Sequence, residues 1–547
     1  MYHSQAKIEN QLHKAENLLS KKKLAEAKKI YLNILNLNQE NKSILEILAD
    51  ICIQQNKYDE ACVYFSKLER LDEHNVLHLT NFAFTLDKLG QFNFALQVLA
   101  RAKEIDPSEI NIYLNETVTL CNLKRFDDAR RSALIALKLE PYSAISFNNL
   151  GAVFQKLGDN DSAKTAFIAA IEIDPTYLDP KINLAGLFEK YYEYEKSRIE
   201  YEKILFENPN LDKLTTNTIK AKMAYSYLRI GDLKKGWEYY ELGMNKEIPF
   251  ESSRNPKRNF NKPKWNGEDL TDKTILIWGE QGIGDEILFG SCICDFQKIK
   301  ANIIIECEHR LVTTFQRSFP KSVVRETAYS SDHLMLAKYH DYDFHIPMGS
   351  LMSHFRKRIE DFDLSQPYLL VCKDKASTYE KRLSKVSTNQ IRIGISWRSG
   401  LLLAERNTNY TAILDWGPIF SIPGIDFVNL QYGECEDELI NAESKFGINI
   451  IRWDDLDLKN DIDSTLSLIS RLDYVISIGN AVCDMSAAIG VTTLKLSKLN
   501  SWDQFGTNYY PLLPTIIPFA TAESNSQAES LFDVANFIKE KLKIKNN

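Results

Sequence analysis

A glycine-rich turn with acidic neighbours lies in residues 274–290, which read TILIWGEQGIGDEILFG. The apolar run at 275–278 predicts a buried strand, and the glycines at 279, 282 and 284 predict a turn before an amphipathic helix that begins at Asp285. Backbone N–H groups at such a helix start attract anions at the carboxyl edge of a parallel sheet. The stretch therefore predicts either an anion-binding turn or a plain strand–helix connection with Asp285 as N-cap.

Length and composition limit what the rest of the chain can be. A chain of 547 residues is expected to form two to four domains. Its net charge of -7 argues against a nucleic-acid binder. No leader-like start and no long uncharged apolar run occur, which predicts a cytoplasmic protein without a membrane span. The nine cysteines and nine histidines lack metal-ligand spacing, so no metal site and no disulfide framework are expected.

The N-terminal half repeats with a period of 34 residues. Small residues recur in strict phase at Ala27, Ala61, Ala95, Ala129, Ala163 and Ser197. A second position four residues later is mostly bulky, and prolines recur at 107, 141, 175 and 209. The pattern resembles the tetratricopeptide repeat, in which small residues allow two helices to cross closely. It predicts an all-α superhelix over residues 1–245, with six in-phase repeats and a displaced seventh unit.

One polar position recurs in the same frame, at Asn81, Asn115, Asn149 and Asn183. It falls in the first helix of each repeat, on the face expected to line the inside of the superhelix. An amide has two donors and an acceptor, so a ladder of amides can hold a peptide backbone without reading its side chains. The ladder resembles that of the protein O-GlcNAc transferases, which hold an extended acceptor polypeptide. The alternative is that these amides only stabilise helix packing.

Beyond the repeats, residues 246–272 predict a turn-rich, basic and solvated linker that contains Arg254 and Arg258. Short apolar runs then alternate with helical patterns, which predicts parallel strands at 302–305, 344–346, 391–397, 427–430, 474–478 and 492–496. Two α/β units follow, at 273–375 and 388–547, with a break near 373–389. Two Rossmann-like units that face each other would form a GT-B glycosyltransferase architecture.

Several short motifs occur in a characteristic order: KWNG at 264–267, EQGIGD at 280–285, GISWRSG at 394–400, Arg406, LQY at 430–432 and LDYVIS at 472–477. The series resembles bacterial proteins in which tetratricopeptide repeats precede a heptosyltransferase-like (family 9-like) glycosyltransferase domain. Some relatives of this architecture modify flagellin with a nonulosonic acid. The resemblance implies a metal-independent glycosyltransferase with a nucleotide-sugar donor, no other cofactor, and a protein acceptor such as flagellin in the repeats.

The resemblance also implies roles for particular residues. The family's proposed general base falls on Asp285, where a carboxylate can take the proton of an attacking hydroxyl, and Glu280 is the reserve candidate. The alternative for Glu280 is a surface carboxylate at a strand end. The positions expected to bind the donor are Gly282, Gly284, Trp397, Arg398, Arg406, Gln431, Tyr432, Gly479, Asn480, Ala481 and Asp484.

The turn after the strand at 474–478 departs from the family pattern. The family commonly has a His in the following helix, and this chain has Asp484. A carboxylate beside a diphosphate is unfavourable by roughly 1 kcal/mol or more at a few ångströms. The departure therefore favours a donor with less phosphate charge, such as a CMP-sugar over a UDP-sugar, or a domain that has lost activity.

Two features that mimic binding sites have simpler explanations. The pairs Asp455/Asp457 and Asp461/Asp463 resemble a metal-binding DxD, but they precede a helical run, where Asp is favoured as a cap. Trp397 and Tyr432 follow strands and could stack on a base or sugar, yet aromatic residues at strand ends usually belong to the core.

Two hypotheses of different class remain, and a third is weaker. The first is a cytoplasmic protein O-glycosyltransferase. The second is a binding scaffold whose transferase-like domain no longer turns over, which Asp484 favours. The third is a glycan acceptor in place of a protein, which the asparagine ladder argues against.

Overall fold

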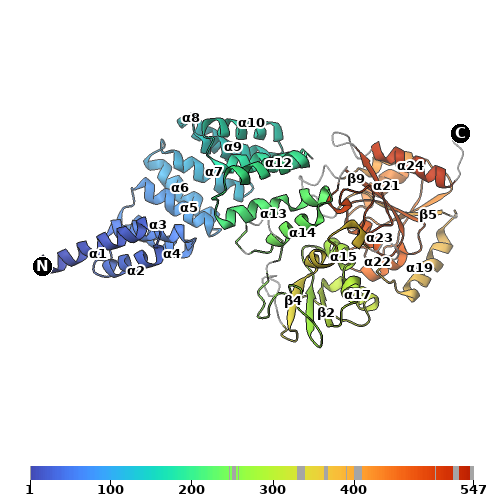
Figure 1. Ribbon diagram of the computed structural model, residues 1–547. Helices are drawn as coiled ribbons and strands as arrows, with labels where there is room; N and C mark the ends of the chain where they lie inside the picture. The colour runs from blue at the N-terminus through green and yellow to red at the C-terminus, as the bar shows by residue number, and fades with distance from the viewer. Residues whose placement is uncertain are drawn as a thin grey trace. The chain divides into compact units, whose positions relative to one another are not determined.

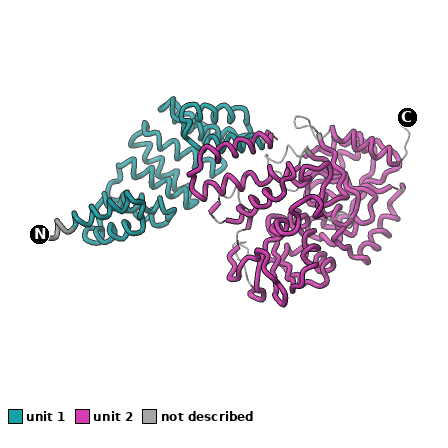
Figure 2. The backbone as a smooth tube through the Cα atoms, in the orientation of Figure 1, with its two compact units in different colours: residues 1–190 teal, residues 191–547 magenta. Residues whose placement is uncertain are grey.

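The computed structural model describes residues 2–191, 193–245, 247–248, 254–256, 258–328, 339–362, 367–389, 391–399, 410–498, 501–521 and 529–542. The chain divides into two compact units, Met1–Lys190 (unit 1) and Tyr191–Asn547 (unit 2), shown in two colours in Figure 2.

Unit 1 is all-helical, and Figure 1 shows its helix pairs in blue to teal. Caps such as Asn41 and Asn75 start its helices by accepting the N–H groups of Ile44 and His78 at 3.2 and 3.1 Å. The helices are α1 (Tyr2–Ser20), α2 (Leu24–Leu35), α3 (Lys42–Gln54), α4 (Tyr58–Leu71), α5 (Val76–Lys88), α6 (Phe92–Ile105), α7 (Ile110–Asn122), α8 (Phe126–Leu139), α9 (Ala144–Leu157), α10 (Asn160–Ile173) and α11 (Leu178–Lys190).

The predicted repeat packing is confirmed. All six recurring small residues, Ala27 to Ser197, are 0% exposed. The position twelve residues earlier is also closely packed: a Cβ at Gly151 would lie 2.6 Å from the ring of Phe167, which is itself 0% exposed. Bulk at either position would force neighbouring helices apart.

The boundary between the units falls after α11, before the repeat periodicity ends. Unit 2 therefore begins with three more helices, α12 (Tyr194–Glu207), α13 (Lys213–Arg229) and α14 (Leu233–Leu242). The displaced seventh unit forms α13 and α14, which we call the helical hairpin. It is fixed to the α/β part of unit 2, since the buried indole of Trp237 donates to the carbonyl of Arg356 at 3.0 Å.

The first sheet of unit 2 has four parallel strands in the order β3-β2-β1-β4. The strands are β1 (Thr274–Trp278), β2 (Asn302–Cys307), β3 (Val323–Glu326) and β4 (Phe344–Pro347). The intervening elements are α15 (Ile283–Gly290), α16 (Ile293–Phe296), η2 (His309–Leu311), α17 (Val312–Ser318), η3 (Met348–Ser350), α18 (Leu351–Phe355) and η4 (Ile359–Asp361).

The second sheet has six parallel strands in the order β10-β9-β8-β5-β6-β7. They are β5 (Ile391–Ser396), β6 (Ile425–Asn429), β7 (Ile450–Ile451), β8 (Tyr474–Ile478), β9 (Thr492–Lys498) and β10 (Ile516–Thr521). Around them lie α19 (Lys373–Val386), η6 (Ile413–Asp415), α20 (Gly417–Phe420), α21 (Glu436–Phe446), α22 (Ile462–Ile469), α23 (Ala481–Ala488), η7 (Trp502–Gln504) and α24 (Ser530–Lys541).

Each predicted strand is present, so the prediction of parallel α/β sheets after a helical repeat array is confirmed. The stretch predicted as the break between the two α/β units forms helix α19, which lies in the chain between the strands of the first sheet and those of the second and buries Ala376, Tyr379 and Leu383. Among the residues described, no helix combines the length and the apolar character needed to cross a membrane.

Candidate functional site

Both sheets contain a point where the strand order reverses. It lies between β1 and β4 in the first sheet and between β5 and β8 in the second, whose order matches the doubly wound 3-2-1-4-5-6 arrangement. In open α/β sheets, ligands bind beyond the carboxyl ends of the strands at this reversal. The glycine turn follows β1 and the Gly479–Asn480–Ala481 turn follows β8, so the two predicted turns lie at the two reversals.

The helices that follow these turns, α15 and α23, lie against each other (Figure 1). The contact is close, because a Cβ at Gly284 would lie 3.1 Å from Oδ2 of Asp484. Two predicted site residues from different sheets, more than a hundred residues apart in the chain, are thus brought together.

Asp285 lies in the first turn of α15 and is only partly buried. The helix begins at Ile283 with Gly282 as N-cap, so the expectation that Asp285 is the N-cap was wrong. Its Oδ2 nevertheless accepts the Gly282 N–H at 3.3 Å and stabilises the helix start. The carboxylate thus supports the helix start and keeps part of its surface accessible.

Glu280 is 1% exposed, in contrast to the surface carboxylate considered as its alternative. Its Oε2 accepts from Nε of Arg254 at 2.8 Å, and its Oε1 accepts from the Gly349 N–H at 2.9 Å and from a second nitrogen of Arg254. Both oxygens are therefore engaged in a buried ion pair, which favours a structural role over that of a base.

The sequence predicted a solvated linker, and residues 266–269 are indeed exposed, but the prediction was wrong for its two arginines. Arg254 and Arg258 are 3% and 6% exposed. Arg254 also donates to Oε1 of Glu241 on α14 at 2.9 Å, and Arg258 pairs with Glu306 on β2 at 2.7 Å. Buried charges need such partners to offset the loss of water.

Glu286, the residue after Asp285, was not predicted as part of the site. It is 3% exposed, and its Oε2 accepts the Glu308 N–H at 2.9 Å. Burial raises its pKa to about 8, although the Glu308 N–H opposes the shift; the charges of Glu308, Asp285 and Glu280 add to it. Only the folded structure places this carboxyl under the turn.

Asn480 organises the second turn. Its Oδ1 accepts the N–H groups of Val482 and Cys483 at 3.0 and 3.2 Å, so it is the N-cap of α23. Its Nδ2 donates to Oγ of Ser396 on β5 at 2.9 Å. The amide thus ties the ends of β5 and β8 together and leaves the start of α23 fixed.

The environment of Asp484 is strongly charged. Burial raises its pKa to about 7, Lys495 opposes the rise, and the charges of Asp503 and Asp285 increase it. Lys495, which was not predicted, is buried on β9 with its Nζ 3.2 Å from Oδ2 of Asp503. A Cβ at Gly479 would lie 3.2 Å from Cε of Lys495, so the lysine stem supports this turn.

Other predicted donor-binding residues are held by the protein itself. Trp397 is 0% exposed and its Nε1 donates to Oε2 of Glu438 at 2.6 Å, so its indole offers no open face for stacking. Arg398 pairs with the same carboxylate at 2.6 Å. The buried Oε1 of Gln431 accepts the N–H groups of both residues at 3.0 Å, which fixes the loop after β5. Arg406 lies outside the described residues.

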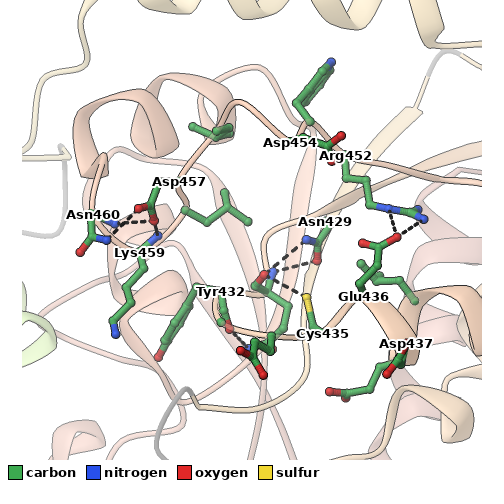
Figure 3. A pocket seen from close by; sticks show the side chains of 18 residues that line it. Asn429, Tyr432, Cys435, Glu436, Asp437, Arg452, Asp454, Asp457, Lys459 and Asn460 are labelled. Carbon is green, nitrogen blue, oxygen red and sulfur yellow. Dashed lines mark hydrogen bonds and ion pairs between the residues drawn. The ribbon is translucent and has the colours of Figure 1, made fainter.

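A cavity of about 850 Å³ opens where β6 and β7 end (Figure 3). Tyr432 and Trp453 are among its lining residues. Arg452, one of its two cations, pairs with Glu436 at 2.8 Å and with Glu443 at 2.8 Å. The lining carries an excess of carboxylates, namely Glu434, Glu436, Asp437, Glu438, Asp454 and Asp457. Such a lining disfavours a diphosphate and suits uncharged hydroxyl-rich groups or cations.

The nearby Asp pairs that mimic a metal motif have structural partners. Asp461 is the N-cap of α22 and accepts the Ser464 N–H at 2.9 Å, as predicted. Asp455 pairs with Arg382 at 2.6 Å, and Asp457 accepts from Asn460 at 2.7 Å. Within the described residues, no group of three or more His, Cys, Asp or Glu side chains is arranged to hold a metal ion.

The four ladder asparagines of unit 1 are all partly buried. Nδ2 of Asn115 donates to the carbonyl of Thr80 at 3.0 Å, and Nδ2 of Asn183 donates to Oδ1 of Asn148 at 2.9 Å. These bonds join one repeat to the one before it. Part of the hydrogen-bonding capacity of the ladder is therefore used within the array.

Comparison with known proteins supports the tetratricopeptide repeats. A tetratricopeptide-repeat model matches residues 43–75 and 144–177. The chain is 30% identical over 306 residues to Protein FlbA of Caulobacter vibrioides, a match that covers 54% of this chain and 50% of that protein. The chain therefore spans about half the length of this relative.

Parts of the chain resemble several solved structures. YrrB, described as a TPR protein with an unusual peptide-binding site, is 23% identical, with a TM-score of 0.26 over 31% of this chain and 88% of YrrB. TTC0263 of Thermus thermophilus is 20% identical, with a TM-score of 0.30 over 33% of this chain and 98% of that one. PilW, a type IV pilus biogenesis factor, is 14% identical, with a TM-score of 0.33 over 38% and 97%.

Glu280→Gln is expected to destabilise unit 2 by about 2–4 kcal/mol, because it leaves Arg254 buried with one compensating carboxylate fewer. Thermal unfolding followed by circular dichroism measures the effect. Glu360→Gln, at an exposed position of η4, is the matched control. A Glu280→Gln protein with the unfolding midpoint of the wild type would contradict the structural role.

Glu286→Gln is expected to change how stability depends on pH. The wild-type carboxyl has a pKa of about 8 when folded and an ordinary value of 4.5 when unfolded. The folded state thus holds the proton more tightly, and stability falls as pH rises from 4.5 to 8, by at most about 1.4 kcal/mol per pH unit. The amide does not titrate, so the variant should gain stability over the wild type between pH 5 and about 8.

Unfolding midpoints measured across this pH range test the prediction. Glu326→Gln, at an exposed position on β3, controls for replacing a carboxylate by an amide. Parallel pH curves for wild type and Glu286→Gln would show that the buried carboxyl is not held neutral.

Proposed function

We propose that this chain is a protein O-glycosyltransferase that moves a sugar from a nucleotide-sugar donor to a Ser or Thr hydroxyl of an acceptor polypeptide. One observation carries the proposal: the two sheet reversals present the starts of α15 and α23 to each other, with Asp285 at their meeting point. Glycosyl transfer requires a base and a group that stabilises the leaving anion. The strand-order reversal of the first sheet supplies the first, and the helix start at the reversal of the second sheet supplies the second.

In the proposed reaction, Asp285 accepts the proton of the acceptor hydroxyl as its oxygen forms a bond to the anomeric carbon. The bond between that carbon and the donor phosphate oxygen breaks, and the nucleotide leaves with the electron pair. The N–H groups at the start of α23, fixed by Asn480, stabilise the negative charge on the leaving phosphate. No metal is needed for these steps.

The charges around the Gly479–Asn480–Ala481 turn affect how many phosphates the donor can carry. Asp484 and Asp503 lie near the start of α23 together with Lys495, and the cavity beyond β6 and β7 is rich in carboxylates. These groups favour a donor with a single phosphate over one with a diphosphate. A CMP-linked sugar, such as a CMP-activated nonulosonic acid, meets this condition.

The repeats indicate a protein-binding role, and the tetratricopeptide matches agree with it. The family resemblance of the motifs suggests flagellin as the acceptor. The asparagine ladder would hold the polypeptide through its backbone groups.

Asp285→Asn is expected to abolish transfer while donor binding persists. The amide keeps the hydrogen bond to Gly282 but cannot accept the proton, so the rate should fall by about 100-fold or more. Purified protein, flagellin and a CMP-sugar are incubated, and the mass of flagellin is measured; calorimetry measures donor binding. Asp374→Asn, an exposed first-turn carboxylate of α19, is the matched control. The proposal fails if the wild type binds no CMP- or UDP-sugar.

The second candidate function is a protein-binding scaffold whose transferase-like domain has no catalytic activity, and three observations favour it. Asp484 replaces the His of the resembling family, Trp397 is enclosed in the core, and Arg398 is already paired with Glu438. In that case the repeats bind the partner and Asp285→Asn has no effect in cells.

Under both candidates, Asn115→Ala combined with Asn149→Ala is expected to weaken acceptor binding by about 100-fold, since each amide removed costs roughly one or two hydrogen bonds to the peptide. Titration with labelled flagellin measures the affinity. Asn122→Ala is the matched control, because Nδ2 of Asn122 also bridges two repeats, to Asp87 at 3.0 Å, from outside the ladder. Unchanged affinity with a lowered unfolding midpoint would show that the ladder only packs the helices.

A further inference from the structure

Four aromatic side chains from four different elements form one group, which contacts the glycine turn through Tyr240. Tyr225 on α13 and Tyr240 on α14 have ring centroids 5.9 Å apart, and Tyr225 lies 5.3 Å from Trp502 of η7. Phe289 on α15 completes the group, 6.0 Å from Tyr240 and 6.3 Å from Trp502. We call these four residues the aromatic cluster. It joins the helical hairpin, the first sheet and the second sheet of unit 2.

Asp285 faces this cluster. It precedes Phe289 by four residues on α15, and residues with this spacing lie on the same face of a helix. Its charge reaches both tyrosines: burial raises the pKa of Tyr225 and that of Tyr240, and the nearby Asp285 carboxylate adds to both shifts. The candidate base and the aromatic cluster therefore share one environment.

The cluster has a buried part and an accessible part. Tyr240 and Phe289 are 3% and 1% exposed, whereas Tyr225 and Trp502 each keep accessible surface. The Trp502 Nε1–H has no hydrogen-bond acceptor within the described part of the chain. An indole donor left open beside a tyrosine ring can receive a polar group of a ligand.

The turn adds a polar group at the same place. Gln281 adopts a left-handed backbone conformation with φ of 65°, and its N–H donates to the carbonyl of Asn255 at 2.6 Å. Its Nε2 donates to the Tyr240 hydroxyl at 3.0 Å, and the amide also lies beside the Tyr225 hydroxyl. Non-glycine residues are rarely held in this conformation, so the turn presents its amide at some conformational cost.

We propose that Tyr225 and Trp502 form the subsite for the acceptor residue, holding the hydroxyl-bearing side chain and its backbone against Asp285. This inference rests on the proposed glycosyltransferase function. The two rings are neutral and would pack on the short aliphatic part of the acceptor Ser or Thr side chain. The indole N–H of Trp502 would donate to a backbone carbonyl of the acceptor. Tyr225 and Trp502 are thus positioning residues, and the helical hairpin is part of the site as well as a continuation of the repeats.

The location of Tyr225 assigns it to the acceptor and not to the donor, and Trp502, on η7 after β9, faces it from the second sheet. The candidate groups for the donor phosphate lie at the start of α23 and at the ends of β5 and β8. Tyr225 comes instead from the hairpin, which contacts the β1–α15 turn through Tyr240 and Gln281. The Tyr225 ring, on the hairpin side of this turn, is therefore suited to contact the acceptor residue whose hydroxyl approaches Asp285.

The test compares Tyr225→Ala, Tyr225→Phe and Trp502→Phe with the wild type in the full-length chain. Initial rates are measured with purified flagellin and a CMP-sugar, varied separately, and calorimetry gives the donor Kd. Phe532→Ala, an exposed aromatic position on α24 (63% exposed), is the control. The two phenylalanine variants keep an aromatic ring, so they remain informative if Tyr225→Ala does not fold.

The expected result is a rise of about tenfold in the KM for flagellin with Tyr225→Ala or Trp502→Phe, with the donor Kd unchanged within about twofold. Tyr225→Phe should keep the unfolding midpoint and show a smaller rise in this KM. An unchanged KM for flagellin, or a change confined to the donor Kd, overturns the subsite. A wild type that binds no nucleotide sugar, in contrast, overturns the proposed function itself.

Discussion

The buried guanidinium of Arg254 holds together three segments that are distant in the sequence. It pairs with Glu280 of the glycine turn and Glu241 of α14, donates to Oγ of Ser350 in η3, and stacks on the ring of Tyr240 at 4.1 Å. Burial alone would raise the pKa of Glu241, but Arg254 and Lys264 hold it at about 2, so the carboxylate stays ionised. Because an unpaired buried charge is costly, these segments have little freedom to separate. The place of Asp285 depends on this arrangement, since the turn that carries it is fixed by Glu280.

The sequence predicted the repeat array and most strands because both depend on local periodicity. The small positions from Ala27 to Ser197 repeat without a slip, and short, mostly apolar runs such as 474–478 alternate regularly with helical patterns. Strands β3, β7 and β10 were missed, since β7 has only two residues, β3 ends in Arg325 and Glu326, and β10 contains Pro518, which counts against a strand. A short or mixed strand forms because a neighbouring strand offers it hydrogen bonds, and no single window contains that information.

The candidate site was predicted less completely than the fold. The turns at Gly284 and Asn480 were found from their glycine and cap signals, and each lies at the strand-order reversal of its own sheet. The ion pair of Glu280 with Arg254, the neutral carboxyl of Glu286 and the charge environment of Asp484 were not predictable, because each arises from burial next to residues from other elements. The sequence likewise could not distinguish an exposed Trp397 from the enclosed one that the structure contains.

The close approach of Gly284 to Asp484 has a mechanical consequence. With α15 of the first sheet and α23 of the second in contact at this point, a sugar placed between the two helix starts under the proposed function would require them to move apart. Each catalytic cycle would then include an opening and a closing step, and such steps often limit turnover more than bond-making does. The absence of a side chain at Gly284 would set how far the closed state can exclude water.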